Sequence, residues 1–325
     1  MKAPDFWWQP RANWQARALA PLGALYAAIT ARRMARPGFR ASVPVLCCGN
    51  PTVGGSGKTT LALDLVARLR ARGRHPACIT RGYGGTQRGT ARVTTQDAAT
   101  VGDEALLLAA AAPTYVGADR AASALRAIAD GADVLVMDDG LQNPSLMKDG
   151  TFLVVDGAVG FGNGRPIPAG PLREALPAAI ARCQAAVLIG ADQVGVHAQL
   201  AGLPVLSAQL QADASDLAGR KLYAFAGIGR PAKFAETLTA AGAQVVRLHG
   251  FPDHHPYTDA DIRLVLAAAD GLGATPVTTP KDAMRLPPSL RHRINTVGVR
   301  LVWSDEAALD TLLDAMLARV LGSSS

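Results

Sequence analysis

The chain has 325 residues, enough for about two domains at roughly 150 residues each. Hydrophobic residues make up 49% of it and charged residues 18%, a balance that can bury a core and that excludes a disordered or collagen-like chain. Its four cysteines show no CxxC spacing, which disfavours a disulfide framework or a zinc site and indicates a reducing compartment.

The net charge of +7 is concentrated at the N-terminus. Residues 1–40 contain seven Lys or Arg residues and a single Asp, so they carry +6 of this charge. A nucleic-acid-binding protein more often distributes its basic residues over a folded face. We therefore expect no nucleic-acid ligand, and the sequence gives no sign of an obligate protein partner.

Residues 1–36 predict an amphipathic helix with aromatic residues before it. Three of the four tryptophans lie in this segment, and apolar residues between Leu19 and Ile29 recur at spacings of three and four. The uncharged run between Arg17 and Arg32 has 14 residues, fewer than the ~20 that cross a bilayer. Two interpretations stay open at this point: a helix packed on its own domain, or a helix lying in the interface of an anionic membrane.

A glycine-rich loop follows the apolar run Val43–Cys48, which predicts a buried strand. Residues 49–60 read GNPTVGGSGKTT, and a helical pattern begins directly after them. Strand, glycine-rich loop, Gly-Lys-Thr and helix is the order typical of a P-loop. Thr52 stands where the strict pattern GxxxxGK[ST] has glycine, so the loop is a variant.

Such a loop binds the phosphates of ATP through its backbone N–H groups and the helix N-terminus. Lys58 would reach the β- and γ-phosphates, and the Thr59 hydroxyl would bind Mg²⁺. The expected nucleotide contacts are Thr52, Val53, Gly54, Gly55, Ser56, Gly57, Lys58 and Thr59.

A second strand is predicted to supply the metal ligands. Residues 132–137 are mostly apolar and lead directly into Asp138 and Asp139. In a parallel sheet both loops emerge at the carboxyl edge, where ligands bind. We expect ATP with Mg²⁺, one aspartate holding the ion and the other orienting water or a neighbouring side chain.

The nucleotide site does not name the reaction, because either water or an alcohol could accept the phosphate. Arg81 and Tyr83 lie in a glycine-rich turn, and Asp103 opens a predicted helix, where it could also be a simple N-cap. The glycine-rich segment 160–174, with its flanking arginines, indicates a loop that binds an anion. His254 lies in an irregular, histidine-rich segment and could pair with a distant carboxylate.

Taken together, these segments resemble the tetraacyldisaccharide 4'-kinase family of lipid A biosynthesis. The resemblance covers almost the whole chain and rests on eight ordered motifs, at residues 49–59, 81–85, 102–104, 138–142, 160–164, 168–174, 251–254 and 281–283. Some positions depart from the family pattern. Many relatives have Phe, Gln and His after the paired aspartates, where Leu141, Gln142 and Asn143 stand here, and Thr60 replaces a frequent proline.

The resemblance implies transfer of the γ-phosphate of ATP to the 4'-hydroxyl of tetraacyldisaccharide 1-phosphate, the lipid A disaccharide. It implies that Asp103 is the base that accepts the hydroxyl proton, in a pair with His254, and that Lys58 and Asp139 complete the catalytic set. The implied metal ligands are Thr59, Asp138, Asp139, Glu104 and Glu174. The implied substrate contacts are Arg81, Tyr83, Gln142 and Arg173.

The resemblance also implies a peripheral enzyme on the cytoplasmic face of the bacterial inner membrane, with its N-terminal helix on anionic lipids. Two rivals are a membrane-associated P-loop ATPase switch, which needs no distant histidine, and a soluble small-molecule kinase, which does not need residues 1–36.

The alternating strand and helix signals predict an α/β fold, a P-loop parallel sheet with helices on both faces. We expect an N-terminal membrane-associated helix at 1–36, a nucleotide-binding kinase domain at 37–220 and a smaller C-terminal α/β lobe at 221–325. Because Asp103 and His254 would lie on different lobes with the lipid sugar between them, catalysis would depend on lobe closure.

Overall fold

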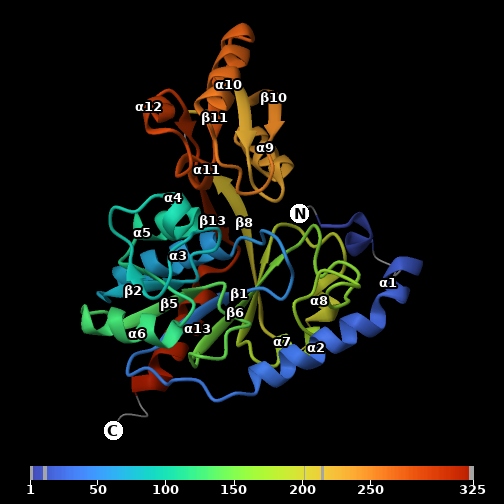
Figure 1. The fold of residues 1–325 in the computed structure, drawn as a ribbon, viewed down its shortest axis with the longest axis vertical. Coiled ribbons are helices and arrows are strands. Elements are labelled where there is room, and N and C mark those ends of the chain that lie inside the picture. The colour runs from blue at the N-terminus through green and yellow to red at the C-terminus, as the bar shows by residue number, and fades with distance from the viewer. Residues whose placement is uncertain (1–2, 10–12, 201, 214–215, 322–325) are drawn as a thin grey trace.

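A computed structural model describes residues 3–9, 13–200, 202–213 and 216–321 of the chain. A nine-stranded sheet forms its larger part (Figure 1). In spatial order its strands are β13 (Val299–Trp303), β8 (Val205–Ala212), β7 (Ala185–Ile189), β6 (Gly150–Asp156), β1 (Val45–Gly49), β5 (Val134–Asp138), β2 (Pro76–Thr80), β4 (Thr114–Val116) and β3 (Ala91–Arg92). Neighbouring strands are parallel, except that β13 with β8 and β3 with β4 are antiparallel.

The central strands are buried on both faces, which explains why they read as continuous apolar runs. Every residue of β1, β2, β5, β6 and β7 is buried. The helices of this part are α3 (Lys58–Ala71), α4 (Ala98–Val101), α5 (Asp103–Ala109), α6 (Arg120–Ala129), α7 (Leu176–Ile180), α8 (Val196–Gln199) and α13 (Glu306–Leu321). Side chains of α3, α5 and α13 cover one face of the sheet, and those of α6 and α7 cover the other.

A second, four-stranded sheet stands at one end of the molecule (Figure 1). Its parallel strands are, in order, β10 (Gln244–Gly250), β9 (Lys221–Ala226), β11 (Thr275–Thr278) and β12 (Asn295–Thr296). Its helices are α9 (Pro231–Ala240), α10 (Asp259–Gly271), α11 (Pro280–Ala283) and α12 (Pro288–Arg291). Two apolar cores, one around Phe225 and Tyr257 and one around Phe234 and Leu238, hold this smaller part together.

The end of the chain differs from the expected interval 221–325 for the smaller lobe. That interval places residues 299–303 in the smaller lobe, but β13 pairs antiparallel with β8 in the large sheet. Leu301 and Trp303 join the core that α3 and α13 share. Alternating burial along a strand shows that one face is covered, but it does not show which sheet the strand joins.

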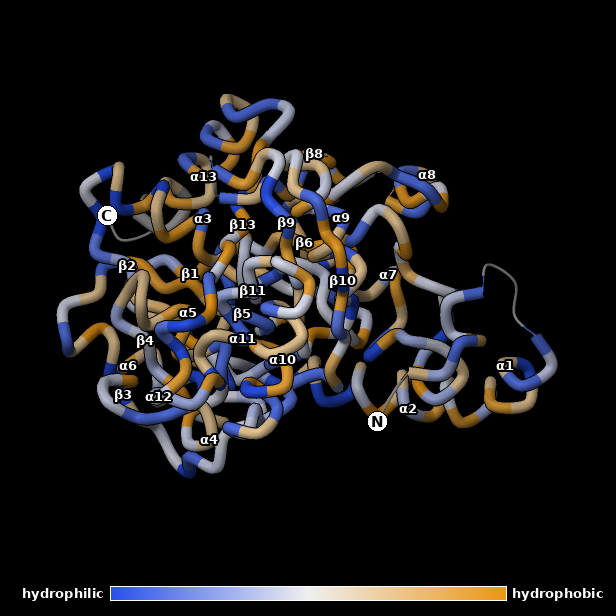
Figure 2. Tube along the Cα trace, turned by 90° about the horizontal axis from the view of Figure 1, so that it is seen from above, coloured by the Kyte–Doolittle hydropathy of each residue, from blue (hydrophilic) through white to orange (hydrophobic). Residues whose placement is uncertain are grey.

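The N-terminal segment forms η1 (Asp5–Trp8), α1 (Trp14–Ala18) and α2 (Ala20–Met34), which lie to one side of the large sheet (Figures 1 and 2). One face of α2 is open to solvent, since Leu22, Leu25 and Ile29 are 55%, 59% and 61% exposed. Within the described residues, we find no helix with the length and apolar character that crossing a membrane requires.

Candidate active site

The P-loop connects β1 to α3 and depends on glycine at Gly57. This residue has a φ of 95°, and a Cβ added there would lie 2.6 Å from Ile189 Cδ1. Thr52, the departure from the strict pattern, is buried, and its hydroxyl and its N–H both donate to Asn50 Oδ1. Thr52 therefore closes the first turn of the loop, whereas residues 53–60 line the cavity beyond it.

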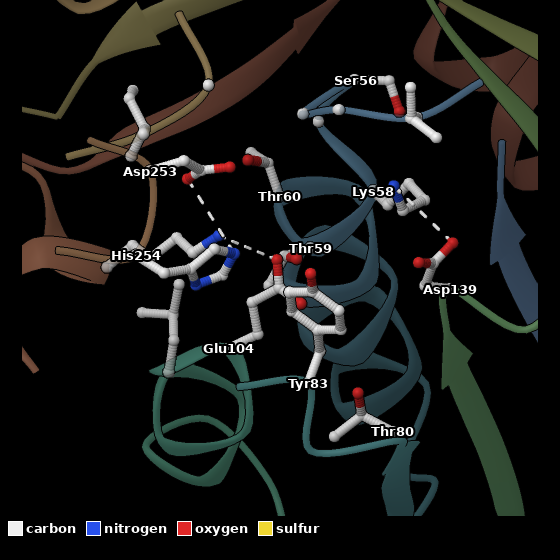
Figure 3. Close-up of a pocket in the computed structure, with 18 of the residues that line it drawn as sticks. Ser56, Lys58, Thr59, Thr60, Thr80, Tyr83, Glu104, Asp139, Asp253 and His254 are labelled. Atoms are coloured by element: carbon white, nitrogen blue, oxygen red, sulfur yellow. Dashed lines mark hydrogen bonds and ion pairs between the residues drawn. The ribbon is translucent and has the colours of Figure 1, made fainter. Parts of the chain in front are cut away.

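A cavity of about 920 Å³ opens above the carboxyl ends of the central strands, between the two sheets (Figure 3). The large part contributes the P-loop, Arg81, Tyr83, Glu104, Asp139, Gln142 and Arg173 to its lining. The smaller part contributes Arg230, Lys233, Asp253, His254 and Lys281. Tyr26 and Arg33 of α2 reach the same cavity, so three separate regions of the chain enclose it.

Asp138 is the last residue of β5 and lies beside the start of α3. Its Oδ2 accepts a hydrogen bond of 2.9 Å from the Thr59 hydroxyl, and its buried Oδ1 has no hydrogen-bond partner among the described residues. Burial, together with the charges of Glu104 and Asp139, raises the pKa of Asp138 to about 7, although Lys58 opposes this shift. A buried carboxylate oxygen without a partner, next to a threonine hydroxyl, fits a divalent cation.

Two of the other proposed metal ligands, Glu104 and Glu174, form contacts with other side chains. Glu104 pairs with Lys281 at 3.0 Å. Glu174 is buried against Gln142 and Arg182, and it lines a separate cavity of about 260 Å³ beside α2. Among the described residues, no three His, Cys, Asp or Glu side chains are grouped to hold an ion. Where nucleotide phosphates complete the coordination of Mg²⁺, few protein ligands are needed.

Asp139 links three parts of the nucleotide site. Its carboxylate lies 3.7 Å from Lys58 Nζ (Figure 3). It also accepts two hydrogen bonds, of 3.0 and 2.9 Å, from Arg173 Nη1. Burial alone would raise its pKa, but the charges of Lys58 and Arg173 lower it below the ordinary value. Its φ of 52° is unusual for a residue other than glycine, which is typical of positions held by their surroundings at functional sites.

The structure brings Asp103 and His254 together from the two parts. Asp103 opens α5 and is 2% exposed, and its Oδ2 lies 3.1 Å from His254 Nδ1. Gly102 is the N-cap of α5, so Asp103 is not the simple N-cap that its position allowed. The Tyr83 ring lies 5.3 Å from the His254 ring, and both point into the cavity (Figure 3).

Positive charge surrounds the Asp103 carboxylate. Burial would raise the pKa of Asp103, but the hydrogen bond to His254 and the charges of Lys281 and Arg285 lower it below its ordinary value. Arg285 Nε lies 3.0 Å from Asp103 Oδ2, and its Nη2 donates to Asp282. Asp103 is thus ionised at neutral pH and held by groups of the smaller part.

Sequence reasoning missed three of the residues that shape this site. Arg285 fixes Asp103, Arg120 lines the cavity, and Asp156 at the end of β6 binds Arg230 and Lys233 of the smaller part at 3.0 and 2.8 Å. A signal did exist for Arg120, because a cation at the first position of a helix opposes the helix dipole. Asp156 could have been found as an acidic residue at the carboxyl end of a parallel strand.

Fold and cavity together define the class of this protein. A glycine-rich loop between β1 and α3, with Lys58 and Thr59 at the helix start and Asp138 on the adjacent strand, is a P-loop nucleotide site. Beside the same cavity, a buried carboxylate paired with a histidine can take the proton of a hydroxyl acceptor. The chain is a P-loop phosphotransferase.

Comparison with known proteins gives the family. A family model described as tetraacyldisaccharide-1-P 4'-kinase matches residues 15–318. Two similar proteins are named tetraacyldisaccharide 4'-kinase. The one from Gluconacetobacter diazotrophicus is 55% identical to this chain over 322 residues, and the one from Rhodospirillum rubrum is 50% identical over 327 residues; each alignment covers 98% of both chains. A crystal structure described as the "apo" form of LpxK from Aquifex aeolicus in complex with ATP aligns with a TM-score of 0.76 at 26% identity, over 93% of this chain and 99% of that one.

The chain therefore belongs to the tetraacyldisaccharide 4'-kinase family. This membership confirms the predicted resemblance, the P-loop α/β fold and ATP as the phosphate donor. It favours a tetraacyldisaccharide 4'-kinase over both rivals, the ATPase switch and the small-molecule kinase. The roles of the individual site residues and the membrane contact of α2 stay predictions.

Proposed function

We propose that this chain transfers the γ-phosphate of ATP to the 4'-hydroxyl of tetraacyldisaccharide 1-phosphate. The observation that carries the proposal is the contact of 3.1 Å between His254 and Asp103 beside the P-loop cavity. A hydrolysing switch has no need of a proton acceptor delivered by a second sheet, whereas transfer to an alcohol does. The names of the relatives, which specify this acceptor, support the same reaction.

The proposed transfer gives roles to Asp103, His254, Lys58 and Mg²⁺. The 4'-oxygen attacks the γ-phosphorus, the bond from that phosphorus to the β,γ-bridging oxygen breaks, and ADP leaves. Asp103 accepts the hydroxyl proton, and His254 stabilises the protonated pair through its Nδ1 contact. Lys58 balances charge on the phosphates, and bound Mg²⁺ would neutralise the charge that develops on their oxygens.

Steady-state transfer to lipid A disaccharide 1-phosphate tests this assignment. We expect Asp103→Ala and His254→Ala to lower kcat by roughly 10²- to 10⁴-fold, with nucleotide affinity changed little. His197→Ala is a matched control, because His197 forms a similar contact of 2.8 Å with Asp192 on the exposed surface. Full activity of Asp103→Ala would refute the base, and absence of product from the wild type would refute the reaction.

We also propose that α2 lies in the cytoplasmic leaflet of the inner membrane, on anionic lipids. Leu22, Leu25 and Ile29 share an exposed face of the helix, and Arg32 and Arg33 follow in its last turn. Arg33 lines the catalytic cavity, so a lipid held at this helix has its head group close to the site.

Flotation with vesicles that contain an anionic phospholipid tests this contact. Burying a leucine contributes about 1.5–3 kcal/mol, so Leu25→Glu is expected to weaken binding by tenfold or more. Leu264→Glu is the control, since Leu264 is a leucine on α10 of the smaller part that is even more exposed than Leu25. Equal binding by both variants would contradict the assignment of α2.

We propose further that the two sheets belong to lobes that close on the reactants. Asp103 lies in the part with the large sheet, while His254 and Arg285 come from the part with the small one. The pair of Asp103 and His254 would thus form only when the lobes close.

A further inference from the structure

Arg120 is a buried cation that points into the catalytic cavity. It is the first residue of α6, directly after the turn that follows β4. The residue is 3% exposed, yet it lines the cavity. Its Nη1 donates to the Gly117 carbonyl, and its Nε has no hydrogen-bond partner among the described residues.

This arrangement is costly in the absence of an anion. A buried charge that lacks a counter-charge destabilises the folded protein. Burial and the nearby charge of Arg81 lower the pKa of Arg120 to about 10, against the attraction of Asp139 and Asp138. The dipole of α6 is also unfavourable for a cation at this end.

Neither nearby aspartate forms an ion pair with Arg120 among the described residues. Asp139 binds Lys58 and Arg173, and Asp138 accepts from Thr59. The missing counter-charge for Arg120 would therefore come from the cavity. Arg81 lines the same cavity and increases the positive charge there.

The sheet topology shows on which side of the nucleotide site these arginines lie. The P-loop follows β1, the paired aspartates follow β5, Arg81 follows β2, and Arg120 comes after β4. These four strands are adjacent in the order β1, β5, β2, β4. With strands about 4.8 Å apart, the arginines begin about 10–14 Å from the P-loop strand, beyond the aspartates.

We propose that Arg120, together with Arg81, binds a phosphate group of the reactants on the acceptor side of the cavity. This inference rests on the proposed function. A guanidinium presents parallel N–H groups that match phosphate oxygens, and a desolvated one binds them strongly. Two sources carry this chemistry: the phosphoryl group during transfer and the 1-phosphate of the lipid acceptor.

Kinetics of Arg120→Gln with acceptors that have or lack the 1-phosphate separate the two sources. With the natural acceptor we expect kcat/KM to fall by about 10²-fold or more, while KM for ATP stays within about threefold. Arg120→Lys should be more active than Arg120→Gln but less active than the wild type, because lysine keeps the positive charge and lacks the parallel N–H groups of the guanidinium. Arg126→Gln is the control, since Arg126 lies on the exposed side of α6 and pairs with Asp130.

If the loss is the same with the dephosphorylated acceptor, Arg120 binds the transferred phosphoryl group. If it disappears with that acceptor, Arg120 binds the 1-phosphate. If Arg120→Gln stays within threefold of the wild type with both acceptors, the proposal is wrong.

A binding measurement keeps the proposal testable without the lipid. Inorganic phosphate added to the MgADP complex should raise the melting temperature of the wild type more than that of Arg120→Gln. An equal rise in both proteins would overturn the proposal. A wild type that responds to phosphate but phosphorylates no lipid would instead refute the proposed function alone.

Discussion

Replacing Asp138 by asparagine is expected to stabilise the metal-free protein at pH 8 and to abolish its response to Mg²⁺. The pKa of Asp138 lies at about 7 rather than its ordinary 3.8, chiefly because of burial. Each pH unit of such a shift corresponds to about 1.4 kcal/mol, so the ionised carboxylate costs the folded state up to about 4 kcal/mol. The unpartnered Oδ1 is the structural origin of this cost.

The sign follows from proton binding. Between pH 4 and 7 the unfolded chain has released the Asp138 proton while the folded protein retains it, so wild-type stability falls as pH rises and levels off above 7. Asparagine does not titrate. The stability advantage of Asp138→Asn should therefore widen by about 2 kcal/mol between pH 5.5 and 8.

Urea unfolding in EDTA at these two pH values measures the difference, and a repeat with Mg²⁺ measures the response to the ion. Asp139→Asn is the control with the opposite sign. Burial raises the pKa of Asp139, but Lys58 and Arg173 lower it below the ordinary value, so its charge stabilises the fold and its loss should destabilise at pH 8. If Asp138→Asn is no more stable than the wild type at pH 8 without metal, the reasoning fails.

Two further predictions concern the junction of the two parts. Burial raises the pKa of Asp103, whereas His254 and nearby cations including Arg285 lower it, so Arg285→Met should move the acidic limb of the kcat–pH profile to higher pH. An unchanged profile would assign Arg285 a packing role only. Asp156→Asn breaks the ion pairs that join β6 to the start of α9, so amide exchange in α9 should accelerate about tenfold, with β6 little affected. Equal exchange of α9 in Asp156→Asn and the wild type would show that these ion pairs do not hold the parts together.

The nucleotide half of the site could be predicted because its signals are local. A strand, a glycine-rich loop and a helix are contiguous in sequence, and Thr59 meets Asp138 through the general geometry of parallel sheets. The structure also explains the Thr52 variant, which binds Asn50 two residues earlier.

The other half depends on contacts between distant residues. The pairing of Asp103 with His254 was expected only through the family resemblance, and no periodicity or spacing links residues so far apart. Arg285 and Arg120 were missed for a similar reason: Arg285 matters through its ion pair with the distant Asp103, and Arg120 through its burial and its unpartnered Nε. Glu174, which the resemblance implied as a metal ligand, contacts Arg182 and Gln142, and its role stays a prediction.

The return of β13 to the large sheet means that the smaller part begins and ends at one place. Ala212 at the end of β8 pairs with Val299 at the start of β13, and Asp213 N–H donates to the Gly298 carbonyl at 2.8 Å. The smaller part is thus an insertion between the two antiparallel strands β8 and β13, which a short turn would otherwise join as a β-hairpin. A short turn could replace this whole insertion, leaving a minimal nucleotide-binding protein that lacks His254.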